Sequence, residues 1–194
     1  MSFLTSISKE DIKNLPLFVF NGTIHIIDSQ QKVNDAIGIL NKEKKIGFDT
    51  ETKPVFKKGV VHKIALIQLA TENDAFLFRI NKIGFPDALI HIFENESVQK
   101  IGADINLDLK GLKKSRDFSP VGFVDIQKIA AKLNIKEISL RHLTAIVLNY
   151  RLSKRQQLSN WEKDKLTQGQ LNYAAADAYI CLKIYNKLQQ YLNE

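Results

Sequence analysis

Cysteine is almost absent from this sequence of 194 residues, in which Cys181 is the only one. One cysteine excludes an intrachain disulfide, and we therefore expect a cytoplasmic protein, because disulfides belong to oxidising compartments. Cys181 lies among apolar neighbours in the stretch AYICLKIY. Such surroundings are typical of a buried, unreactive thiol and not of a nucleophile.

Long apolar runs are also missing. No run approaches the ~20 residues that a helix needs to cross a bilayer, so no membrane contact is expected. The first residues, MSFLTSISKEDIKNL, carry acids early and lack the apolar stretch of a signal peptide. With no repeat, linker or low-complexity tract, we expect one domain over residues 1–194, with a core at about 23–191 and an N-terminal extension at 1–22.

Acidic residues are in short supply, since 21 Asp and Glu are set against 28 Lys and Arg, a formal net charge of +7. This excess favours a polyanionic partner, because lysine and arginine neutralise phosphates and release counterions. The positions of the few acids are therefore informative.

The hydrophobic pattern predicts an α/β fold with a mixed β-sheet flanked by helices. A short helix is expected after Ser8, ending near Pro16. Strands are expected at 23–27, 45–51, 63–71, 74–80, 98–104 and 121–125, and helices at 31–44, 85–95, 105–114, 126–133, 139–150 and 171–192. Three strands in succession, followed by alternating strands and helices, indicate the mixed sheet.

Two acids stand at the end of a predicted core strand, IGFDTET. Asp49 and Glu51 are separated by Thr50, and since strand side chains alternate, both carboxylates face one side while Thr50 faces the other. Like charges beside a core repel each other and lose solvation. Chance explains a D-x-E triplet, and phosphatases of the haloacid dehalogenase type carry a nucleophilic aspartate in a loosely similar setting.

The last predicted helix carries a second group of polar residues. Thr167 and Gln170 form a capping box at its start. Tyr173 and Asp177 are four residues apart and share one face, and the small residues Ala174–Ala176 allow close approach to a neighbour. An alanine-rich packing helix with an exposed aspartate fits the same pattern.

The stretch IGADINLDLKGL repeats the arrangement of an apolar strand that stops on an acid. Asp104 is placed as the N-cap of the next helix, and Asp108 lies one turn into it. Asp49, Glu51, Asp108 and Asp177 would gather in one pocket only if cations neutralised them.

In order and spacing, FDTETKP, ADINLDLKGL and SNWEKDKLTQGQLNYAAADAY resemble the three exonuclease motifs of the DEDD superfamily. YAAAD resembles the third motif of its tyrosine branch, and KIALIQLA resembles a strand of the Werner syndrome exonuclease. The resemblance covers almost the whole chain and implies a ribonuclease H-like fold and a stand-alone 3′–5′ exonuclease, without a helicase or an HRDC domain. The dehalogenase alternative fails, because its later lysine and paired acids are not found in the right order.

The resemblance implies the following site. Asp49, Glu51 and Asp177 hold one divalent cation, and Asp49 holds a second with help from Asp108. Oxygen ligands select Mg²⁺ or Mn²⁺, and two such ions activate the attacking water and stabilise the leaving 3′ oxygen. Tyr173 orients the water, since its ordinary pKa near 10 makes it a poorer general base. The products are 5′-mononucleotides.

Two basic loops supply candidates for substrate binding. KPVFKKGVVHK follows the predicted metal strand and RLSKRQQ precedes the third motif, and their expected phosphate contacts are Lys53, Lys57, Lys58, Lys63, Arg151, Lys154 and Arg155. A solvated surface explains any single lysine equally well.

Three other residues have open roles. Asp104 is either a helix cap or a substrate contact. Phe56 is a candidate for a wedge against the terminal base. Trp161 is either a packing residue, which is the commoner role, or a platform on which a base stacks.

Two alternatives to a DNA exonuclease with a role in DNA repair remain. One is an RNase D-like exoribonuclease, because the 2′-hydroxyl contact that separates RNA from DNA depends on pocket geometry. The other is an inactive nucleic-acid-binding module, which the filled catalytic positions disfavour. Single-stranded or 3′-recessed DNA is the expected partner.

Overall fold

The computed structural model describes residues 3–55 and 62–192 of the chain. Its strands are β1 (Thr23–Ile27), β2 (Lys45–Thr52), β3 (Ile64–Ala70), β4 (Asp74–Phe78), β5 (Gln99–Gly102) and β6 (Phe123–Asp125). Its helices are α1 (Lys9–Asn14), α2 (Gln30–Leu40), α3 (Ile80–Ile83), α4 (Asp87–Glu94), α5 (Ile105–Lys113), α6 (Ile126–Lys132), α7 (Leu140–Leu148) and α8 (Gln168–Leu192).

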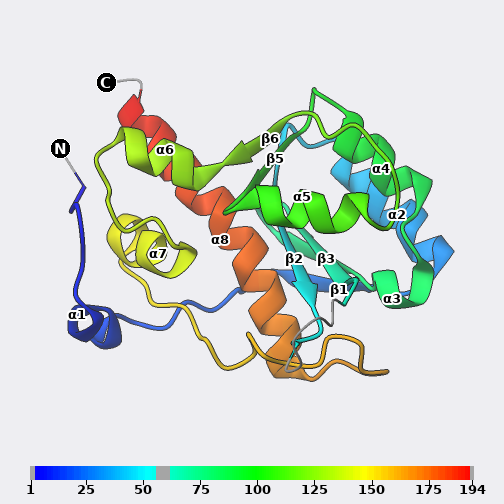
Figure 1. Cartoon of the computed structure of the whole chain (residues 1–194), viewed down its shortest axis with the longest axis horizontal. Coiled ribbons are helices and arrows are strands. Elements are labelled where there is room, and N and C mark those ends of the chain that lie inside the picture. The colour runs from blue at the N-terminus through cyan, green and yellow to red at the C-terminus, as the bar shows by residue number, and fades with distance from the viewer. Residues whose placement is uncertain (1–2, 56–61, 193–194) are drawn as a thin grey trace.

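The strands form one mixed sheet in the order β1-β4-β3-β2-β5-β6, as the strand pattern predicted. β2, β3 and β4 are antiparallel neighbours, and the outer pairs β1–β4, β2–β5 and β5–β6 are parallel. Helices cover both faces (Figure 1). In the described part of the chain, no helix is long and apolar enough to cross a membrane.

The two faces of the sheet are packed differently. Phe48, Leu69 and Phe76 belong to an apolar cluster that α2, α4 and α5 complete on one face. The other face is crossed by α8, with α6 and α7 beyond it (Figure 1). Phe48 and Asp49 are neighbours on β2, so the alternation of the strand sends a phenyl ring into one layer and a carboxylate toward the other.

α8 lies directly against β2, and a glycine makes this possible. A Cβ atom on Gly47 would stand 2.0 Å from the carbonyl oxygen of Ala178. The predicted capping box at the start of α8 is confirmed, because the backbone N–H of Gln170 donates to Thr167 Oγ1 (3.3 Å) and the N–H of Thr167 donates to Gln170 Oε1 (3.1 Å).

Two local predictions are wrong. The stretch expected to continue as a strand to Ile80 instead ends at Phe78, and the short helix α3 follows. Asp104 occupies the N-cap position of α5 without a side-chain capping bond. It is in the left-handed region (φ 54°, ψ 39°), whereas a capping residue is ordinarily extended, so its carboxylate does not reach the free N–H groups of the helix.

Candidate active site

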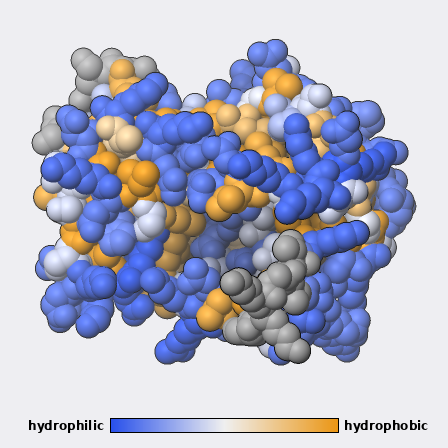
Figure 2. Space-filling view, in the orientation of Figure 1, coloured by the Kyte–Doolittle hydropathy of each residue, from blue (hydrophilic) through white to orange (hydrophobic). Residues whose placement is uncertain are grey.

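The site lies where β2 runs past the end of β5. β5 pairs with β2 only at Lys45, Ile46 and Gly47, so the second half of β2 has β3 as its single strand neighbour. The surface is hollowed near the middle of the face on which β2, α5 and α8 meet (Figure 2).

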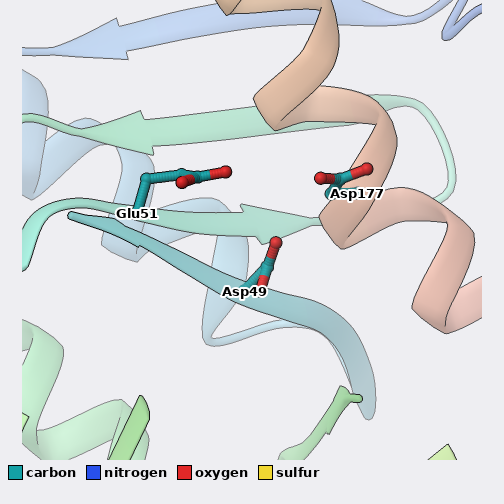
Figure 3. A group of neighbouring side chains, drawn as sticks. All are labelled: Asp49, Glu51 and Asp177. Carbon is teal, nitrogen blue, oxygen red and sulfur yellow. The ribbon is translucent and has the colours of Figure 1, made fainter. Parts of the chain in front are cut away.

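Three of the predicted carboxylates converge in this position. Asp49 and Glu51 project from the same side of β2, and Asp177 projects toward them from α8 (Figure 3). One carboxylate oxygen from each lies within 4.8 Å of the others. Asp177 is buried, whereas Asp49 and Glu51 are half-buried at the mouth of the hollow.

Asp108 lies at the edge of this group and has a different partner. Its carboxylate accepts a short hydrogen bond from the hydroxyl of Thr50, which points away from Asp49 and Glu51 as the alternation of the strand requires. Asp108 remains close enough to raise the pKa values of Asp49 and Glu51. The structure therefore gathers all four acids but places only three of them around one point.

The convergence changes the acidity of every member. Burial and then the charge of Asp177 raise the pKa of Asp49 well above its usual range, and the same two causes raise the pKa of Glu51 to about 9. Burial raises the pKa of Asp177 to about 7 and that of Asp108 to about 6. Carboxylates held together in this way favour either protons or a cation.

The donor set fits a hard divalent cation, because every candidate ligand is a carboxylate oxygen. A second observation agrees. Gln68 stands opposite Asp49 on β3, is fully buried, and has no hydrogen-bond partner for either amide atom in the described part of the chain. A buried amide without a partner is costly, and an ionised Asp49 beside it offers an acceptor.

Tyr173 lies one turn before Asp177 on α8, and burial raises the pKa of its hydroxyl, followed by the charges of Asp177 and Glu51. Its ring packs against Trp161, with ring centroids 6.0 Å apart. Trp161 is fully buried, so the structure contradicts its place among the substrate-binding candidates and agrees with the packing role. An indole without exposed surface has no face to offer a base.

The basic candidates have mixed outcomes. Lys57 and Lys58 lie outside the described residues, as does Phe56. Lys53 forms an ion pair with Glu162 (3.4 Å). Lys63 lines a hollow of about 390 Å³ that also borders Glu51, Asp108 and Lys114.

The second basic loop divides in the same way. Nε of Arg151 donates to the carbonyl of Leu15 (3.0 Å), so part of this guanidinium holds the N-terminal segment in place. Lys154 and Arg155 are exposed, and Arg155 lines a second hollow, of about 340 Å³, which borders Tyr173 and Asp177.

Sequence reasoning missed two residues of the site. Thr50 was assigned only to the opposite face, although it holds Asp108, and Gln68 was treated as part of an apolar strand. Gln68 carried a signal, because it is the single polar side chain in the otherwise apolar run IALIQLA. Thr50 carried none, since its partner lies 58 residues away in the sequence.

Comparisons with known proteins agree with this geometry. A family described as 3′–5′ exonuclease matches residues 24–193. The bifunctional 3′–5′ exonuclease/ATP-dependent helicase of Mus musculus is 36% identical over 185 residues, which cover 90% of this chain. Those residues span only 13% of the mouse protein.

Solved structures show the same fold. The Nibbler EXO domain of Aedes aegypti has a TM-score of 0.82 at 24% identity, covering 91% of this chain and 93% of that one. RNase D of Escherichia coli, an exoribonuclease involved in structured RNA processing, has a TM-score of 0.80 at 22% identity, covering 88% of this chain and 45% of that one.

Proposed function

The chain belongs to the DEDD family of 3′–5′ exonucleases, and on that premise we propose that it shortens DNA from the 3′ end and releases 5′-mononucleotides with two divalent cations. The convergence of Asp49, Glu51 and Asp177 within 4.8 Å carries this proposal. It supplies a cation site at the bottom of a cleft in a basic protein, which suits a phosphodiester substrate.

The residues that would hold the cations follow from the donor set. Asp49, Glu51 and Asp177 form the first group, and Asp108 with Asp49 forms the second. Mg²⁺ or Mn²⁺ bound there supplies an activated water and neutralises charge on the phosphate and the leaving oxygen. Thr50 keeps the Asp108 carboxylate in place, because a ligand held by a hydrogen bond keeps its orientation.

Tyr173 acts as a donor that positions water and not as a base. Burial and the neighbouring carboxylates raise the pKa of its hydroxyl, so it stays protonated at neutral pH. A protonated phenol can donate one hydrogen bond to a water beside Asp177, and the packed Trp161 ring restricts its movement. Orientation of this kind contributes to rate without changing metal affinity.

The choice of DNA rests on the degree of similarity. The chain is 36% identical to the mouse exonuclease/helicase and 22% identical to the E. coli exoribonuclease. Trimming of RNA is the alternative outcome of the same test. A role in DNA repair would follow only from a DNA substrate.

The test uses DNA and RNA strands of matched sequence, 5′-labelled so that each shortening step is seen, with Mg²⁺, with Mn²⁺ and with chelator. We expect a descending ladder on DNA that requires metal, and slower shortening of RNA. A covalently closed circle of the same sequence is the control. Cutting of the circle as fast as the linear strand would disprove the exonuclease activity, and preference for RNA would reassign the substrate.

A further inference from the structure

The segment Leu17–Phe20 precedes the region that matches the exonuclease family, which begins at residue 24, yet it lies beside the active site. It is held against the chain that precedes α8. The N–H of Phe18 donates to the carbonyl of Arg151 (2.9 Å), and the N–H of Arg151 donates to the carbonyl of Pro16 (2.9 Å). The position of this segment is therefore well determined.

Alternate side chains of the segment have different surroundings. Phe18 and Phe20 point to α8, where their rings lie 6.0 and 5.0 Å from the ring of Tyr179. Leu17 and Val19 point the other way and are 41% and 51% exposed. Anchoring explains the two phenylalanines, but folding does not explain two exposed apolar side chains beside a cleft, and such surfaces commonly mark contact sites.

These side chains line the hollow of about 340 Å³ that borders Tyr173 and Asp177. The same hollow is lined by Arg155, Gln156 and Asn172. Oε1 of Gln156 accepts from Ser159 Oγ (2.6 Å), which fixes the amide next to Gly169. An apolar wall, two amides and one guanidinium next to the catalytic carboxylates suit an aromatic heterocycle that carries a phosphate.

The hollow on the other side of the carboxylates has a different character. It borders Glu51 and Asp108 and is lined by His62, Lys63 and Lys114. Basic side chains of this kind suit the phosphates of an incoming strand. The contrast assigns the backbone to the side of Asp108 and leaves the apolar hollow beside Tyr173 for a base.

We propose, building on the exonuclease function above, that Leu17 and Val19 form one wall of a subsite for the base of the 3′-terminal nucleotide. The base is held against the apolar wall, and Arg155 lies where it can approach the 5′-phosphate. The N-terminal segment is thereby a substrate-binding element of this enzyme and not only a covering for α7 and α8.

The first test measures binding without hydrolysis. Calorimetry with dAMP and AMP, and with deoxyribose 5-phosphate and ribose 5-phosphate, compares wild type with Val19→Ser and Leu17→Ser. We expect each variant to weaken nucleotide binding by about tenfold, the effect of removing an apolar contact from a pocket, and to leave sugar phosphate binding unchanged. Ile39→Ser, at a position on α2 that is 40% exposed and away from the cleft, is the matched control and should change neither.

The second test identifies which nucleotide occupies the subsite. Shortening is measured on strands that lack the base of the terminal or of the penultimate nucleotide. The loss of kcat/KM in Val19→Ser should disappear when the terminal base is missing and persist when the penultimate base is missing. The reverse pattern, or equal losses on all strands, would overturn the assignment.

The two proposals fail separately. Selective nucleotide binding in a protein that shortens no strand would retain the subsite and remove the exonuclease function. Normal shortening of DNA, with nucleotide binding equal in wild type and Val19→Ser, would retain the function and remove the subsite.

Discussion

Residues 45–48 of β2 lie in the body of the sheet, whereas residues 49–52 extend beyond β5 and pair with β3 alone. The first half holds Ile46, Gly47 and Phe48, which are buried between layers. The second half holds Asp49 and Glu51, which reach a hollow that α5 and α8 border. The backbone is extended throughout, so the difference arises from the neighbours.

The contrast shows where a sheet can accommodate buried charge. A strand with neighbours on both sides and helices on both faces has room only for apolar side chains, because an unpaired charge there is costly. Where one neighbour ends, a helix terminus and a cleft can approach the strand. Acids at that position can then exchange protons for cations from solvent.

The largest expected effect is on the second half of the strand. Asp177→Asn should lower the rate by on the order of a thousandfold or more, because a cation ligand contributes several kcal/mol in the transition state. In chelator its melting temperature should equal or exceed that of wild type, since one of a set of repelling carboxylates is removed. Initial rates and melting curves test this, and Asp35→Asn on α2 is the control. A variant that loses stability and rate together would point to a structural aspartate instead.

Tyr173→Phe should lower the rate by about one to three orders of magnitude, because a positioned hydroxyl is lost but no ligand is. The rise in melting temperature on addition of Mn²⁺ should remain as large as in wild type. Rates across pH together with melting curves provide the measurement. Wild-type activity over the whole pH range would show that the hydroxyl has no role.

Gly47→Ala tests the boundary between the two halves. Its new Cβ would stand 2.0 Å from the carbonyl oxygen of Ala178, so α8 must move away from β2. We expect a loss of about 3 kcal/mol in the free energy of unfolding, with reduced activity because Asp177 moves with the helix.

The matched control is Gly38→Ala on α2, where a Cβ meets nothing within 4 Å. This change should raise stability by up to about 1 kcal/mol, the difference in helix propensity. Urea denaturation of both variants compares them. Equal stabilities for the two variants would mean that α8 does not depend on the glycine for its close approach.

Thr50→Val removes the hydroxyl that donates to Asp108 and keeps the shape of the side chain. We expect divalent metal affinity to fall by about tenfold, the lower end of the effect of losing a group that orients a ligand. Thr52→Val, one turn of the alternation later and exposed, should leave affinity unchanged. Calorimetric titration with Mn²⁺ gives both values, and an unchanged affinity in Thr50→Val would separate Asp108 from the metal site.

The smallest effect concerns pH. The folded pKa values of Glu51 (about 9), Asp177 (about 7) and Asp108 (about 6) exceed their ordinary values of 4.5, 3.8 and 3.8. The folded, metal-free protein therefore binds more protons than the unfolded chain, and its stability should fall as pH rises from about 4 to about 9. Saturating Mn²⁺ should reduce this slope.

Glu51→Gln isolates one contribution to that slope. The buried Lys100, whose pKa burial lowers to about 8, acts in the opposite direction above that pH. In chelator, Glu51→Gln should lose less stability than wild type between pH 7 and pH 9. Identical slopes would show that Glu51 does not titrate within the cluster.

Much of this architecture was predictable from local rules. The period of the apolar residues located the strands and most helices, and the alternation along β2 correctly separated Thr50 from Asp49 and Glu51. The motif spacing identified the acids and Tyr173. Asp104 was predicted wrongly, because its position indicated a cap while its left-handed backbone conformation depends on the chain around it.

The chemical identity of the site is a property of the amino-acid sequence, since acids in a basic chain and a tyrosine four residues before an aspartate are visible without coordinates. The places of Gln68, Trp161 and Leu17–Phe20 are not, because each depends on partners distant in the chain. Contacts across more than a hundred residues follow from how layers pack, and packing depends on the shapes of all the side chains together. Gly47 shows this most directly, since the absence of a side chain matters there only because Ala178 lies above it.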